Sequence, residues 1–185
     1  MNIRSLTLVV AALLIAHEAR AQRGTLVPIA NTSYIGINPL GIPFDIFTAE
    51  GETGVAQGIT LGALGSHIDV DNDRYSSLDF KFRYYPGEVV LRGFSLGATV
   101  GVLGYSKRSE VFFPNGAGSS TERESLNAAT LGIIADYNWL LGSQHRFLVG
   151  TGLGAKRVLA SSDERSRVGL DRAYMTARFT VGIAF

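Results

Sequence analysis

The C-terminal segment alternates between two kinds of side chain with a period of two. Apolar residues occupy the odd positions from Phe179 to Phe185, and small or polar residues occupy the positions between them. Such a period places the two sets on opposite faces of a β-strand. The same alternation recurs along most of the chain, so it constrains the protein to a sheet whose strands have one apolar and one polar face. The apolar row of this last strand is Phe179, Val181, Ile183 and Phe185.

Residues 1–21 have the features of a cleavable secretory leader. Arg4 precedes an apolar run that ends at Ala16, and Ala19-Arg20-Ala21 supplies the small-residue pattern that comes before a cleavage site. The apolar run is too short to span a bilayer. We therefore expect a signal peptide over 1–21 and one exported domain over 22–185.

Charge and cysteine content exclude several classes of protein. Removing a leader with two arginines and one glutamate from a chain of 17 basic and 16 acidic residues leaves a balanced domain, which argues against nucleic acid as a partner. The absence of cysteine excludes disulfides, thiolate metal sites and a lipid-modified N-terminal cysteine. The mean hydropathy is +0.17 although no segment after the leader approaches the roughly 18 apolar residues of a spanning helix. Apolar residues spread over many alternating, glycine-rich segments are typical of a membrane β-barrel.

The alternation predicts an all-β fold, an eight-stranded antiparallel up-and-down transmembrane β-barrel. We expect strands at 25–37, 40–50, 54–67, 75–85, 93–106, 124–139, 146–160 and 168–185. Short connections at 51–53, 86–92 and 141–145 are predicted to be periplasmic, and the connections at 68–74, 107–123 and 161–167 are predicted to be extracellular. Parity requires the segment 25–37, because the last strand must end in the periplasm and bacterial barrels have an even number of strands. Asn38 to Gly41 is then expected to form a tight outer turn.

The polar row is charged and is predicted to face the lumen. In 78–84, Asp79, Lys81 and Arg83 alternate with large apolar residues. A lysine or arginine that faces lipid costs roughly 2–4 kcal/mol, so this row must point inward. The predicted inward charges are Asp79, Lys81, Arg83, Asp136, Lys156, Arg172 and Arg178, with Asp45 a further candidate. Since an eight-stranded barrel is only wide enough for its side chains, we expect ion pairs to plug the lumen and inward glycines to leave room for them.

The inward row has two further features, an excess of basic residues and one break in its alternation. The predicted inward set has more basic than acidic groups, so any narrow path through it should prefer anions. Leu126 and Ala128 break the alternation of their strand, which predicts a β-bulge near its outer end.

Aromatic residues gather beside the predicted short turns and at Phe185, as they do at membrane interfaces. With this pattern the chain resembles the small, porin-like eight-stranded outer-membrane barrels of Gram-negative bacteria, the group that includes the OmpA transmembrane domain and OmpX. Asn38-Pro-Leu-Gly-Ile42, followed by Phe44, Phe47 and Glu50, also resembles the opening of a poorly characterised family of outer-membrane barrels. The resemblance implies contact with outer-membrane lipids. It also implies that the C-terminal row ending at Phe185 is the signal for the barrel-assembly machinery.

Two motifs resemble a catalytic pair and a calcium-binding loop, but neither has the geometry or the residues that its function requires. Ser66 and His67 are adjacent, so on a strand they point to opposite faces and cannot act as a pair. The run from Asp69 to Asp73 opens like a calcium loop, but Arg74 replaces the turn glycine and Phe80 replaces the bidentate glutamate. We therefore predict no catalytic residues, cofactor or metal.

The function predicted is that of a non-enzymatic outer-membrane barrel with a structural or surface-interaction role, in which loop 107–123 could contact an extracellular partner. One alternative is a secreted soluble barrel of lipocalin type with an apolar ligand inside, which would place its charges outward. Another is an outer-membrane lipid-modifying enzyme. It would require His67 to face a lipid-accessible groove beside a nucleophile from a neighbouring strand.

Overall fold

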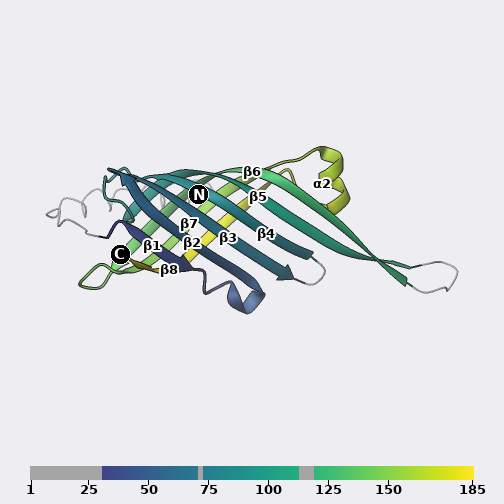
Figure 1. Ribbon diagram of the computed structural model, residues 1–185, viewed down its shortest axis with the longest axis horizontal. Coiled ribbons are helices and arrows are strands. Elements are labelled where there is room, and N and C mark those ends of the chain that lie inside the picture. The colour runs from purple at the N-terminus through teal and green to yellow at the C-terminus, as the bar shows by residue number, and fades with distance from the viewer. Residues whose placement is uncertain (1–30, 71–72, 113–118) are drawn as a thin grey trace, which may run out of the picture. The chain divides into compact units, whose positions relative to one another are not determined.

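The computed structural model describes residues 31–70, 73–112 and 119–185, and these form a closed barrel of eight antiparallel strands in sequence order (Figure 1). The strands are β1 (Ser33–Ile37), β2 (Ile46–Ala56), β3 (Ile59–Val70), β4 (Asp73–Tyr84), β5 (Gly93–Phe112), β6 (Ser119–Leu141), β7 (Phe147–Leu159) and β8 (Ala173–Ala184). The helical turns are η1 (Ile42–Phe44) and α2 (Ser162–Val168). The predicted up-and-down topology is confirmed. Across the described residues, no helix is both long enough and apolar enough to cross a membrane.

The barrel closes where the first strand pairs with the last. β1 and β8 are antiparallel, with pairs from Tyr34–Ala184 to Ile37–Val181. The predicted closure is therefore confirmed. In the described part of the predicted segment 25–37, β1 runs from Ser33 to Ile37. The expected leader, and residues 22–30 after it, lie outside the described residues.

The second strand differs from its prediction in position. The proposed turn at 51–53 lies inside β2, and the hairpin between β2 and β3 turns instead at Gln57 and Gly58, where Gly58 has φ +65°. Residues 40–45 belong to a turn and to η1, which begins next to Pro43. The predicted turn was wrong because Gly51, Glu52 and Thr53 have the composition of a turn, yet Glu52, like Glu50 before it, is a buried inward-facing residue of β2.

The hairpin of β5 and β6 is longer than predicted. Its strands pair in continuous register from Gly93–Asn138 to Phe112–Ser119, so most of the predicted loop 107–123 is a paired ribbon. Figure 1 shows this ribbon projecting beyond the other strands at the end of the barrel where α2 lies, which we call the hairpin end. The opposite end, with the connections at 57–58, 85–92 and 142–146, is the short-turn end.

The predicted bulge at Leu126 and Ala128 is wrong, because the register passes through both residues without a shift. Both side chains stay on the inward face and pack inside the hairpin end. The apolar cluster there is Leu103, Leu126, Ala128, Val158 and Val168, the last of which belongs to α2. Apolar residues therefore replace charges in this part of the interior.

The predicted connection 161–167 contains α2, so β8 starts at Ala173 and not at 168. Ser161 caps the helix by accepting a hydrogen bond from the Glu164 N–H, while the Glu164 carboxylate accepts from Ser161. These hydrogen bonds hold the pKa of the Glu164 carboxyl below its ordinary value. Gly169 ends the helix with φ +71°, a conformation that glycine adopts without strain.

The outward face of the barrel is apolar and exposed. Phe80 (62 %), Ile133 (69 %), Leu153 (63 %) and Met175 (75 %) are among its most exposed side chains. Exposed aromatic residues lie near the short-turn end: Tyr84, Phe94, Trp139, Phe147 and Phe185. The four residues of the C-terminal row also lie on this face, with Ile183 and Phe185 exposed and Phe179 and Val181 half-buried.

Candidate functional site

The centre of the barrel is held by a network of buried ion pairs, with Glu50 as one of its hubs. The Glu50 carboxylate lies 2.5 Å from Lys81 Nζ and 2.6 Å from Arg178 Nη2. Arg178 also donates from Nε to Glu50 Oε1 at 2.9 Å. These contacts join strands β2, β4 and β8, so Glu50 ties the closing strand to the opposite wall. Charge-assisted bonds of this kind are stronger than neutral ones.

Glu52 is the second hub and lies nearer the short-turn end. It pairs with Arg83, accepts a hydrogen bond from Thr60 Oγ1 at 2.6 Å and accepts another from the Tyr85 hydroxyl at 2.9 Å. Because these partners occupy the lone pairs of both oxygens, the buried carboxylate is well compensated.

The two remaining acids also form ion pairs. Arg83 Nη2 lies 2.9 Å from Asp136 Oδ2, and Lys156 Nζ lies 2.5 Å from Asp79 Oδ2. Asn138 links Arg178 Nη1 and the Tyr85 hydroxyl through its side chain. Contacts therefore run continuously from Lys81 through Glu50, Arg178, Asn138 and Tyr85 to Glu52 and Arg83, whereas Asp79 and Lys156 form a separate pair beside this network.

Six of the seven predicted charges lie in ion pairs inside the lumen: Lys81, Arg83, Asp136 and Arg178 in the network, and Asp79 and Lys156 in the separate pair. Arg172 does not, because it precedes β8 and is exposed. Asp45 is also exposed, in the turn after η1.

Sequence reasoning missed Glu50 and Glu52, which extend the inward row of β2. With them, four acids face four bases among the described residues of the lumen, so the predicted basic excess is absent and the argument for an anion-selective path fails. The signal that could have found them is the period of two between Thr48 and Gly54, which continues through both glutamates.

Inward glycines make room for these long side chains, as predicted. A Cβ atom on Gly152 would overlap the Asp136 carboxylate, and one on Gly101 would overlap the Asp79 carboxylate. Each of these glycines lies directly across the sheet from the acid that fills its space.

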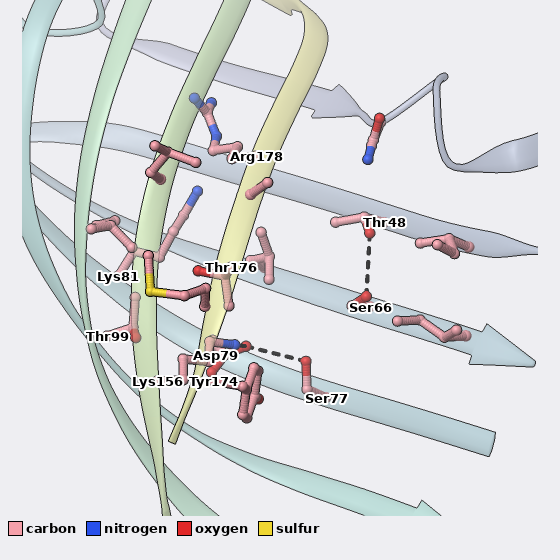
Figure 2. A pocket seen from close by; sticks show the side chains of 18 of the residues that line it. Thr48, Ser66, Ser77, Asp79, Lys81, Thr99, Lys156, Tyr174, Thr176 and Arg178 are labelled. Carbon is pink, nitrogen blue, oxygen red and sulfur yellow. Dashed lines mark hydrogen bonds and ion pairs between the residues drawn. The ribbon is translucent and has the colours of Figure 1, made fainter. Parts of the chain in front are cut away.

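A cavity of about 520 Å³ lies against the network on its hairpin-end side. Figure 2 shows Asp79, Lys81, Thr99 and Lys156 grouped at one end of it, while Thr48 and Ser66 lie further along β2 and β3. Its walls also include apolar side chains such as Leu64, Ile68 and Leu170. The volume falls within the range of small-molecule pockets.

Ser66 and His67 point to opposite faces, as predicted. Ser66 lines the cavity and bonds Thr48 at 3.2 Å, whereas His67 is exposed and its Nδ1 lies 2.8 Å from Ser76 Oγ on β4. Asp69, two residues further along the same face, is paired with Arg74 at 2.7 Å. The carboxylate that could orient the imidazole is therefore engaged elsewhere. Asp71 of the calcium-like run is outside the described residues, and the described part of the chain contains no cluster of three or more acidic or histidine side chains able to hold a metal ion.

Comparison with known protein families finds no family that matches this chain, and comparison with curated proteins finds no matching relative. Among solved structures, the chain is similar to the N-terminal β-barrel domain of Pseudomonas aeruginosa OprF. The sequences are 15 % identical, the TM-score is 0.48, and the match covers 84 % of this chain and 98 % of that one.

Proposed function

We propose that the protein is a non-enzymatic transmembrane β-barrel of the bacterial outer membrane, with a structural or surface-interaction role and a lumen closed by ion pairs. The observation that carries the proposal is the distribution of polarity, which is the reverse of that in a soluble barrel: charged side chains lie inside and apolar side chains lie outside. Glu50, Arg83 and Asp79 are buried within the barrel, while side chains such as Phe80 and Ile133 are exposed on its outer face. Soluble monomers rarely expose apolar patches larger than a few hundred Å², whereas a bilayer solvates such a surface.

The same reversal argues against the soluble lipocalin-like alternative, since that barrel would hold its apolar row inside. For the lipid-modifying enzyme, Ser76 is a candidate nucleophile because its hydroxyl contacts His67. The nearby carboxylate of Asp69, which could orient the imidazole, is paired instead with Arg74. A nucleophile and base without an orienting group form an incomplete catalytic set.

In the proposed orientation the short-turn end is periplasmic, and α2 and the β5–β6 ribbon are extracellular. Exposed aromatic residues near the short turns support this assignment, since rings of this kind favour the head-group region. The ribbon is then the natural surface for an extracellular partner. Export by the leader and recognition of the row ending at Phe185 by the barrel-assembly machinery complete the proposal.

The test is the location and the electrophoretic behaviour of the protein. We expect it in the outer-membrane fraction, with a mobility in cold detergent gels that changes after boiling, because a closed barrel resists unfolding by detergent. Recovery in the soluble periplasmic fraction, with one mobility at both temperatures, would overturn the proposal.

A further inference from the structure

The wall of the barrel has a gap in its hydrogen bonding beside the cavity. β8 begins at Ala173 and pairs with β7 from its start, but its ladder with β1 begins only at Val181. On the other side, β2 begins at Ile46, and its ladder with β1 ends at Ala49, followed by one bond from Asn38 N–H to the Thr48 carbonyl. We call this gap, flanked by residues 173–180 of β8 and 46–48 of β2, the seam.

The cavity reaches the outer surface through the seam. It is lined by Ile46 and Thr48 on one side and by both faces of β8 on the other. Thr176 and Arg178 belong to the inward row of β8, whereas Met175, Ala177 and Phe179 belong to its outward row. Leu153 of β7, which pairs with Ala177, also lines the cavity from the outward face. The cavity is therefore not confined to the lumen but continues past the edge of β8 onto the outer surface. Met175, at 75 % exposure, marks the outer opening.

The two ends of this passage differ in chemistry. Ile46, Met175 and Phe179 make the seam apolar. At the inner end, the buried Thr99 hydroxyl has no hydrogen-bond partner among the described residues. Among the same residues, the Lys156 ammonium donates only to Asp79. Both side chains approach the Cβ position of Gly132, Thr99 Oγ1 at 2.5 Å and Lys156 Cγ at 3.0 Å, so they are neighbours. A buried polar atom without a partner costs stability unless a ligand satisfies it.

We propose that the seam is a lateral port and that the cavity binds a single-chain amphiphile with a carboxylate head. The head lies against Thr99 and Lys156, and the apolar chain leaves between Ile46 and Met175 toward the surrounding lipid. This rests on the proposed function, because it requires the outward face of β8 to lie in a membrane. Backbone groups left unpaired at the edge of β8 would be costly in hydrocarbon and are tolerated where they line a polar or ligand-filled cavity.

The test uses palmitate as the probe and Met175 as the reporter. The chain has two methionines, Met1 and Met175, so methionine labelled with ¹³C at its methyl group gives a resonance at the seam. In detergent micelles, we expect palmitate to shift the Met175 methyl signal saturably, and hexadecane, which has no head, to bind about tenfold more weakly. Equal binding of palmitate and hexadecane would overturn the assignment of the head site.

Thr99→Val examines the inner end. The change removes the unpartnered hydroxyl with little change of shape, so we expect palmitate binding to weaken about tenfold while resistance to urea stays the same or rises. A purely structural role for Thr99 would leave the palmitate titration unchanged, and that result would contradict the proposal.

Two tryptophan variants examine the port. Ala177→Trp fills the seam and is expected to abolish the saturable response to palmitate. Ala98→Trp changes a matched outward, exposed alanine of β5 that does not line the cavity, and should leave the response intact. If the Met175 methyl shift does not saturate and is the same in the wild type and both variants, palmitate is only partitioning into micelles. That result would overturn the port. Heat-modifiable mobility of each protein tests the membrane barrel separately, so failure of the port and failure of the proposed function are distinguishable.

Discussion

Arg178 of β8 and Glu50 of β2 form a two-pronged ion pair, at 2.6 Å from Nη2 and 2.9 Å from Nε, although the strand between them in the barrel is β1. The pair bridges the place where the sheet closes. Because the β1–β8 ladder is short, side chains in the lumen supply part of the cohesion that backbone pairing supplies elsewhere in the barrel.

Glu50→Ala should therefore destabilise the barrel strongly. It leaves Lys81 and Arg178 buried without their main partner, and loss of one member of a buried ion pair typically costs about 3–5 kcal/mol. Urea unfolding in detergent measures the change. Asp171→Ala, at an exposed acid between α2 and β8, is the control and should be close to neutral. Equal effects of the two substitutions would show that the network contributes little.

Gly152→Ala tests whether the inward glycines are required for space. The new methyl group would overlap the Asp136 carboxylate and displace it from Arg83, at a cost of about 1–3 kcal/mol. Gly65→Ala, on the outward face of β3, is the control for a methyl group added to a strand glycine, because nothing lies within 4 Å of its Cβ position. The same urea titration compares them, and a neutral Gly152→Ala would contradict the packing described here.

The helix α2 should fray in acid. The folded-state pKa of Glu164 is lowered by its hydrogen bonds with Ser161, so the stabilisation is full above the ordinary glutamate pKa and is lost as the pH falls through the folded value. Amide hydrogen exchange of residues 162–168 should accelerate in that range. Ser161→Ala should fray the helix at neutral pH and remove most of the pH dependence. An unchanged pH dependence in this variant would show that another group is responsible.

Single cysteines can establish which end faces outward, because the chain has none of its own. Ser166→Cys in α2 should react with a membrane-impermeant maleimide on intact cells. Ser143→Cys, in the short turn after β6, should react only after lysis. The reverse pattern would invert the proposed orientation and remove the β5–β6 ribbon as an extracellular contact surface.

Much of the barrel could be predicted from the sequence, because a period of two fixes both the strands and their faces. In 78–84, for example, three alternating charged residues could only face the lumen, which fixed the orientation of the whole strand. Prediction failed where the polarity of a residue fits two different positions. The run Gly51 to Thr53 has the composition of a turn, and Leu126 and Ala128 have the apolar character of lipid-facing residues. In the structure Glu50 and Glu52 face other charges, and Leu126 and Ala128 lie in one buried apolar cluster with Val168 of α2.

The start of β8 was missed for a different reason. The signal for α2 was present in the sequence as Ser161 followed by Glu164, with Gly169 at the helix end, a capping pattern that the alternation of the later residues obscured. The cavity and the seam could not be predicted, because they depend on how far β1 extends, and the pattern of residues 25–37 does not show where pairing stops.

The central claim is that the apolar outer face lies in lipid, and a pair of arginine substitutions on β6 tests it most directly. Ile133 and Asn127 are both exposed on the outward face of the strand, but Ile133 lies among apolar neighbours whereas Asn127 is polar and lies nearer the hairpin end. In phospholipid vesicles, Ile133→Arg should lower the free energy of unfolding by roughly 2–4 kcal/mol, and Asn127→Arg should change it by at most about 1 kcal/mol. If both variants unfold in urea like the wild type, the outer face does not lie in lipid and the account is wrong.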